Sequence, residues 1–318
     1  MIVGILGPGG CGGTFLDWTL QYLSGQTHTW HILCDYRTEQ SRIIDQECVP
    51  LVDNPIQGRT AHGHKKTHPD DLCIDPVIEC FKQHTEFALN SFYFVDQFKS
   101  GKTQTEYNQL IAAHHDIKFI TYKFTEADID TVFCFQYEKT SVEKSNIDKK
   151  LMPHSGVPFG QLPIWDQREL LSLYYPLSIR GQILSETIAP YTNNFCLDFK
   201  VAIECVDVVI NDLFQYLGIS ICKERWWQWK KIYNDWKIKN HTQFFKDLDL
   251  IIESIIYGNS FDLSKYNMSF AEETVIASNL LYKHNFGLKS YNKENLSRNT
   301  QQWTEILETN IYHDLTKK

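Results

Sequence analysis

The sequence predicts an α/β fold in which helices flank a mainly parallel sheet, followed by a C-terminal helical extension. Short apolar runs typical of buried strands alternate with segments of helical apolar spacing over the first two thirds of the 318 residues. The last third shows helical spacing alone. The hydrophobic fraction of 42% and the charged fraction of 22% are ordinary for a globular chain, and the chain is long enough for a large core.

The first elements form a strand, a glycine-rich loop and a helix. Residues 2–6 are an unbroken apolar run, which favours a buried strand, and glycines dominate residues 7–13. Apolar residues at helical spacing then predict a helix from Phe15 to near Gly25. Residues 28–35 are expected to form a second strand.

The middle of the chain continues this alternation. Residues 52–75 are polar and His-rich, which favours a loop with a short strand, and residues 74–89 have helical spacing. Strands are expected at 91–95 and 117–122, with a helix at 105–114 between them. The apolar run 132–136 fits either a strand or a helix.

The remaining segments are mostly helical. A charged, Pro- and Gly-punctuated loop is expected at 138–158, and a further strand at 194–199. Helices are expected at 166–174, 178–188, 206–217, 224–239, 243–257, 270–284 and 300–310. We expect one α/β domain over residues 1–222 and a helical extension over 223–318 that packs on the same domain.

Charge and cysteine usage exclude several protein classes. The net charge of −8 gives no overall basic field, so no nucleic-acid partner is expected. No apolar stretch is long enough for a membrane helix, and the N-terminus has no signal-peptide pattern. The nine cysteines occur singly without a CxxC pair, which favours a reducing, cytoplasmic location without disulfides or structural zinc.

The glycine segment 7–14 is the strongest chemical motif. Glycines after a strand let successive backbone N–H groups point at one anion, and the following helix adds its dipole. The spacing matches the phosphate-binding P-loop pattern, except that Gly13 stands where that pattern has lysine. A phosphate or sulfate cradle, a dinucleotide site and a structural turn remain open. The missing lysine disfavours an ordinary ATP- or GTP-dependent enzyme.

The segment 11–16, Cys-Gly-Gly-Thr-Phe-Leu, resembles the Ser-Gly-Thr-Thr-Trp/Phe-Leu loop of the P-loop sulfotransferase family. That family holds the 5′-phosphosulfate of PAPS on a P-loop variant. The resemblance implies a P-loop type of α/β fold and a cofactor site made by Gly9, Gly10, Cys11, Gly12, Gly13, Thr14 and Phe15.

Other segments resemble the same family in the same order along the chain. Lys66-Thr67-His68-Pro69 is similar to its Lys-Thr-His segment, which implies that His68 is the catalytic base, and we expect Lys66 to stabilise the sulfuryl oxygens. The strand expected at 117–122 leads to Lys123, in place of the family's 3′-phosphate-binding arginine, and Thr131 stands in place of its serine. Segments 196–199 and 208–219 resemble its closing strand and Phe-Leu-Gly helix. The likeness spans about residues 1–220. The sequence also resembles divergent sulfotransferase-like proteins of marine phages and bacteria.

The resemblance implies transfer of a sulfuryl group from PAPS to a hydroxyl or amine acceptor, with adenosine 3′,5′-bisphosphate as the product and without a metal. No motif specifies the acceptor or the oligomeric state. Two alternatives remain open. One is a divergent small-molecule kinase that uses Lys65 or Lys66 in place of the missing lysine, and the other is an inactive P-loop fold that serves binding or assembly.

Two further clusters have competing interpretations. His62, His64 and His68 fit a polar loop, a metal site or an acid/base role. Four tryptophans between 226 and 236 lie among lysines, a pattern also found where single-stranded nucleic acid stacks. The helical spacing 226, 229, 233, 236 instead favours an apolar stripe in the core.

Overall fold

A computed structural model describes most of the first 125 residues and the region 191–257. The described residues are 1–8, 11–35, 42–51, 61–64, 75–96, 104–125, 128, 130–132, 161, 191–238, 242–257, 272, 275, 276 and 279. Gly9, Gly10, Lys66 and His68 lie outside this set. So do the helices expected at 166–174, 178–188 and 300–310, and the loop expected at 138–158.

The strands and helices follow one another largely as expected. The strands are β1 Ile2–Pro8, β2 His28–Asp35, β3 Arg42–Pro50, β4 Ala61–His64, β5 Asn90–Asp96, β6 Lys118–Lys123 and β7 Asn194–Asp198. The helices are α1 Gly13–Leu23, α2 Asp75–Gln83, α3 Gln104–Ala113, α7 Phe199–Glu204, α8 Val206–Leu217, α9 Lys223–Ile238 and α10 Thr242–Tyr257. None of the helices in the described part of the chain is both long and apolar enough to cross a membrane.

The chain divides into two compact units. Unit 1 consists of Met1–Asp128 and Gln182–Asn240, and unit 2 consists of Ile129–Gly181 and His241–Lys318. Each unit therefore contains two separate stretches of sequence. The boundary expected at residue 222 falls inside unit 1, because α9 belongs with the sheet.

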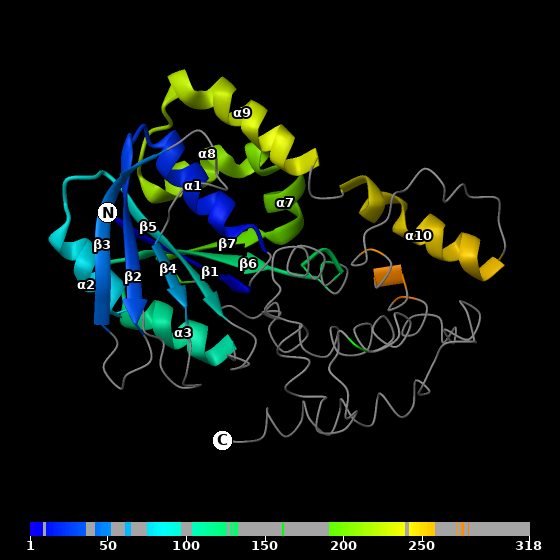
Figure 1. The fold of residues 1–318 in the computed structure, drawn as a ribbon, viewed down its shortest axis with the longest axis horizontal. Helices are drawn as coiled ribbons and strands as arrows, with labels where there is room; N and C mark the ends of the chain where they lie inside the picture. The colour runs from blue at the N-terminus through cyan, green and yellow to red at the C-terminus, as the bar shows by residue number, and fades with distance from the viewer. Residues whose placement is uncertain are drawn as a thin grey trace. The chain divides into compact units, whose positions relative to one another are not determined.

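Unit 1 is built on a five-stranded sheet with the order β4-β5-β1-β6-β7. All four neighbouring strand pairs are parallel, which confirms the α/β fold with a mainly parallel sheet flanked by helices. Figure 1 shows α1, α7, α8 and α9 on one face of this sheet and α2 and α3 on the other. Right-handed crossovers account for α1 lying on one face and α2 and α3 on the other, because the chain moves one way along the sheet after β1 and the opposite way after β4 and β5.

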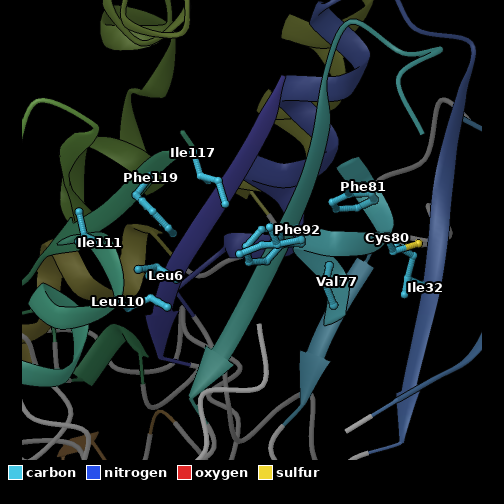
Figure 2. Close-up of a cluster of buried hydrophobic side chains, with 11 residues drawn as sticks. Leu6, Ile32, Val77, Cys80, Phe81, Phe92, Leu110, Ile111, Ile117 and Phe119 are labelled. Carbon is cyan, nitrogen blue, oxygen red and sulfur yellow. The ribbon is translucent and has the colours of Figure 1, made fainter. Parts of the chain in front are cut away.

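The central strand β1 is buried on both faces, as its continuous apolar sequence predicts. On the α2/α3 face, Leu6 joins Phe92 of β5 and Phe119 of β6 in a hydrophobic cluster with side chains of α2 and α3 (Figure 2). Gly4 allows this packing, since a Cβ atom there would lie 2.9 Å from both phenylalanine rings.

The sequence did not predict β3, which pairs with β2 as a separate antiparallel hairpin. The residues 45–48 of β3 are exposed, so they lack the apolar pattern of a buried strand. Trp30 of β2 attaches the hairpin to the end of α2. Its ring stacks on His84 at a centroid distance of 3.8 Å, and its indole nitrogen donates to Glu86 at 2.9 Å.

Unit 2 contains α10, whose buried side chains repeat at helical spacing: Phe244, Leu248, Ile251 and Ile252. Asn279, also buried, donates a hydrogen bond from its side-chain amide to Asp130 at 3.0 Å. The hydrogen bond joins the two stretches of sequence that form this unit.

Candidate functional site

The carboxyl edge of the sheet contains a topological switch point between β1 and β6. These strands pair in parallel, with Leu6 opposite Thr121, so Pro8 and Lys123 end them at the same level. The next strand of this sheet after β1 is β4, on one side, whereas β7 follows β6 on the other side. In open α/β sheets, ligands bind outside the carboxyl ends of the strands at such a point.

Helix α1 begins beside this switch point with a favourable end for an anion. Gly12 caps the helix at φ 76°, a left-handed conformation that glycine adopts without strain. Intrahelical bonding starts with the Leu16 N–H, which donates to the Gly12 carbonyl at 3.0 Å, so the N–H groups before it have no partner within the helix. The first turn carries no acidic side chain, and Thr14 is half-buried. No acidic side chain within the first turn of α1 therefore neutralises the positive end of the helix dipole.

The Cys11 side chain points into the protein and fixes the start of α1. It is fully buried, with its sulfur 3.2 Å from the Tyr93 hydroxyl. A Cβ atom on Gly7 would lie 2.8 Å from that sulfur, and one on Gly13 would lie 2.2 Å from the Tyr93 ring. Burial raises the pKa of the Cys11 thiol to about 12, against the lowering effect of its hydrogen bonds. Cys11 is therefore a neutral thiol at physiological pH, and the whole residue is shielded from solvent in the structure.

Phe15, predicted as a cofactor contact, stacks on Trp236 of α9 beside the helix start. The ring centroids are 4.3 Å apart and the planes differ by 15°. Phe15 is buried, whereas Trp236 is half-buried and lies 3.4 Å from the position of a Cβ on Gly12. An apolar pocket lies beside this pair, between α1 and the helices α7, α8 and α9. It is lined by Cys11, Gly12, Phe15, Leu16, Thr19, Tyr122, Ala202, Ile203, Val206 and Trp236.

The sequence did not single out Trp236 as a site residue. The expected core packing of the tryptophan stripe is confirmed for Trp229 and Tyr233, which are 0% and 1% exposed. Trp236 continues the same stripe, but it ends at the glycine segment of a different part of the chain. Helical spacing identifies the stripe, whereas contact with Gly12 and Phe15 depends on the tertiary fold.

The two residues predicted for the 3′-phosphate fall in different units. Lys123 is exposed at the end of β6, opposite Asp198 of β7. Asp198 does not extend toward a ligand, because its carboxylate accepts the Val201 N–H at 3.1 Å and caps α7. Thr131 is half-buried and belongs to unit 2, so its part in the site stays a prediction.

The predicted catalytic residues Lys66 and His68 follow β4 in the sequence and lie outside the described residues. β4 is the edge strand of the sheet, and β5 separates it from β1. At about 4.8 Å per strand, β4 and β1 are roughly 10 Å apart. His62 and His64 occupy β4, opposite Tyr93 and Val95. Among the described residues, no group of three or more His, Cys, Asp or Glu is arranged to hold a metal.

The sequence also did not single out Asp96, the last residue of β5. β5 lies directly beside β1, with Asp96 opposite Pro8. An aspartate therefore ends the strand next to the glycine segment. The apolar run 91–95 followed by an acidic residue is visible in the sequence. That this strand neighbours β1 is known only from the fold.

Comparison of the chain with protein-family models, with curated proteins and with solved structures found no significant match. The likeness to sulfotransferases accordingly depends on the sequence motifs quoted above.

Proposed function

We propose that this chain binds a nucleotide at the start of α1 and transfers the sulfuryl group of PAPS to a hydroxyl or amine acceptor. One observation carries the proposal. A helix that begins at glycine, without acidic residues in its first turn, opens beside the β1/β6 switch point where Lys123 ends the neighbouring strand. This geometry offers backbone N–H groups and a cation on the same edge of the sheet.

The phosphates would occupy two positions. The N–H groups from Gly9 to Phe15 and the hydroxyl of Thr14 would hold the 5′-phosphosulfate at the helix start. Lys123 would hold the 3′-phosphate, and the same role for Thr131 of unit 2 stays a prediction from the sequence. Lysine supplies a point charge there rather than the bidentate contact of an arginine, so the 3′-phosphate contact is weaker in geometric selectivity.

The Phe15–Trp236 pair supports a nucleotide rather than a simple anion. Nucleobases stack on aromatic side chains, and such stacking contributes about 1–3 kcal/mol per base. The two rings contact each other in the structure, and the half-buried Trp236 has the more exposed position. A base would stack on these rings if Trp236 moved away from Phe15.

The chemical step requires a base and charge stabilisation. The acceptor oxygen or nitrogen would attack the sulfur, His68 would take the acceptor's proton, and the bond from sulfur to the 5′-phosphate oxygen would break. Lys66 would stabilise the sulfuryl oxygens as charge develops on them. Adenosine 3′,5′-bisphosphate would leave, and the reaction needs no metal ion for its electron balance.

A thermal-shift series tests the proposal. Adenosine 3′,5′-bisphosphate should raise the melting temperature more than AMP does, in the presence of EDTA, because it adds the 3′-phosphate contact. Lys123→Ala should remove the difference between the two ligands. Lys118→Ala, at the opposite end of β6, is the matched control and should preserve it. Equal shifts from both ligands in the unmodified protein would contradict the 3′-phosphate site.

Asp96 favours a second candidate, magnesium-dependent phosphoryl transfer. In P-loop NTPases an aspartate on a second strand and a Ser or Thr of the loop hold Mg²⁺. Asp96 lies opposite Pro8 on the strand beside β1, and Thr14 starts α1. This function predicts that ATP binds more tightly with Mg²⁺ than with EDTA and that Asp96→Asn removes the difference. Stabilisation by neither nucleotide would favour an inactive fold that serves binding or assembly.

A further inference from the structure

Two lysines, Lys123 and Lys200, lie at the carboxyl ends of neighbouring strands. Lys123 is the last residue of β6 and lies opposite Asp198, the last residue of β7. Lys200 follows two residues after Asp198, in the first turn of α7. Neighbouring strands are about 4.8 Å apart and two residues span at most about 7 Å, so the Cα atoms of the two lysines are no more than about 12 Å apart. Their flexible side chains can therefore contact one anionic group from two sides.

A buried ring contact holds the two strand ends together. Phe124 follows Lys123 and Phe199 precedes Lys200, and the centroids of their rings are 5.0 Å apart. The two rings are 3% and 1% exposed, whereas both lysines are exposed. The backbone beside each lysine is thus fixed by core packing, and the lysine side chains extend from it into solvent.

The carboxylates beside Lys200 already have backbone partners. The Asp128 carboxylate accepts the Thr125 N–H at 2.7 Å and the Thr125 hydroxyl at 2.8 Å. The Asp198 carboxylate accepts the Val201 N–H at 3.1 Å. Burial raises the pKa of Asp128 against these hydrogen bonds, and the charge of Lys200 acts to lower it, so Lys200 lies near the turn that follows β6.

Both lysines are available to an added anion. Neither forms an ion pair with a residue that the structure describes, whereas Lys230 of α9 pairs with Asp207 at 3.2 Å. A phosphate monoester carries nearly two negative charges and three acceptor oxygens, so it can bind two ammonium groups at once. One lysine alone gives a point charge with little geometric selectivity, whereas two lysines from adjacent strands define a position between them.

We propose that Lys200 is a further specificity-determining residue, which binds the 3′-phosphate of the nucleotide together with Lys123. The inference rests on the proposed function, because the nucleotide is the one whose 5′-phosphate binds at the start of α1. It places the selectivity for a 3′-phosphate on two residues of unit 1, one after each of the neighbouring strands β6 and β7.

Titration calorimetry with three nucleotides in EDTA tests the role of Lys200. AMP has no second phosphate, ADP carries it on the 5′ side, and adenosine 3′,5′-bisphosphate carries it on the 3′ side. Lys200→Ala should weaken the binding of the bisphosphate by about fivefold, which corresponds to one exposed charge pair. The affinities for AMP and ADP should not change. In a Lys123→Ala background the same substitution should have no further effect, because the phosphate has lost its position between the two lysines.

The matched control is Lys223→Ala. Lys223 is also an exposed lysine in the first turn of a helix, but α9 begins beside the far end of α1, where the Cys222 N–H donates to the Leu23 carbonyl at 2.7 Å. This variant should bind all three nucleotides normally.

Two further variants separate the charge of the site from its folding. Lys200→Arg keeps the positive charge and should keep the selectivity for the bisphosphate. Asp198→Asn keeps a residue that caps α7 well but removes a negative charge beside both lysines. It should therefore tighten the binding of the bisphosphate, which a purely structural role of this strand end would not do.

The outcomes separate this inference from the proposed function. A selective loss of bisphosphate affinity in Lys200→Ala, in a protein that turns over no PAPS, would support the role of Lys200 and refute sulfuryl transfer. Unchanged bisphosphate affinity in Lys200→Ala, when Lys123→Ala removes the difference from AMP, would overturn the inference and leave the proposed function standing. An equal loss for ADP would also overturn it, because the effect would then be a general attraction for anions. Equal affinities of the unmodified protein for AMP and the bisphosphate, or no binding of either, would overturn both.

Discussion

The indole nitrogen of Trp229 donates a hydrogen bond to the Thr19 hydroxyl at 3.1 Å, which joins α9 to α1 across 210 residues of sequence. Both side chains are 0% exposed. The contact fixes α9 against the helix that begins at the glycine segment. It thereby determines where Trp236, two turns further along α9, reaches Phe15.

Thr19→Val should destabilise unit 1. Valine keeps the size of threonine but leaves the buried indole N–H of Trp229 without its acceptor, which costs about 1–3 kcal/mol. Urea unfolding monitored by circular dichroism measures the change. Trp227→Ala on the same helix is the control, because Trp227 is 77% exposed and its loss should change stability by about 0.5 kcal/mol or less. Equal stability of Thr19→Val and the unmodified protein would show that this hydrogen bond contributes nothing net.

Tyr233→Phe should loosen the junction between α7 and α8. The Tyr233 hydroxyl accepts the Val206 N–H at 3.0 Å and donates to the Ile203 carbonyl at 3.1 Å, so it satisfies both backbone groups at the break between the helices. Its removal should cost about 1–3 kcal/mol. Hydrogen exchange measures the effect directly. The Val206 amide should lose more protection than the amides within α1, whose exchange should change only as far as the global stability changes.

Gly13→Ala should destabilise the protein through the Tyr93 ring. The new Cβ would lie 2.2 Å from that ring, and overpacking of this kind costs about 1–3 kcal/mol. Chemical denaturation of Gly13→Ala, Tyr93→Leu and the double variant measures the coupling between the two positions.

The smaller leucine should recover part of the loss caused by Gly13→Ala. Gly218→Ala serves as the comparison, because Gly218 has no neighbouring atom within 4 Å of an added Cβ, so any loss there comes from its left-handed φ of 76° and not from a steric clash. Its effect should be additive with Tyr93→Leu. Additivity at Gly13 would contradict the steric explanation.

Cys11 should resist alkylation in the folded protein. Its thiol is buried with a pKa raised to about 12, so almost no reactive thiolate is present near pH 8. Cys48 and Cys196 are exposed and should react with iodoacetamide within the same exposure time. Mass spectrometry of tryptic peptides provides the measurement. Modification of Cys11 at the rate of Cys48, without unfolding, would contradict its burial.

Alkaline pH should destabilise the folded state in part through Cys11. Its pKa is about 12 in the folded protein and 9.0 for an exposed thiol, so the unfolded chain releases this proton first. The contribution to stability is complete below pH 9 and is lost as the pH rises toward 12. Denaturation curves between pH 8 and 11 should show a smaller loss for Cys11→Ser, because serine does not titrate. An identical pH dependence would assign the loss to other groups.

The sequence predicted which segments of unit 1 form strands and helices better than it predicted which of these elements lie side by side. The apolar runs at 2–6, 91–95 and 117–122 each became a strand of the parallel sheet, and Gly218 ends α8 with φ 76° as expected. Local pattern is enough for these, since buried parallel strands and glycine-terminated helices have distinct sequences.

The order of strands, by contrast, depends on contacts distant in sequence. No local pattern indicates that β5 lies beside β1 while β4 forms the edge of the sheet. The sequence analysis therefore gave Asp96 no role and placed the catalytic residues in the segment after β4. Trp236 shows the same limit, because its spacing specifies only a buried helical face. The glycine segment itself was recognisable because backbone freedom is encoded by glycine directly.

The division of unit 1 into two stretches of sequence has a consequence for folding kinetics. Its sheet is completed by β7, which pairs with β6 through Phe119 and Asn194, and its α1 face is covered by α9. These contacts have high contact order, and chains dominated by such contacts fold slowly. During synthesis, β1 and β6 emerge well before β7, which leaves one edge of β6 without its partner strand. We therefore expect completion of the sheet by the second stretch to be the slow phase of refolding, after β1, β5 and β6 have paired.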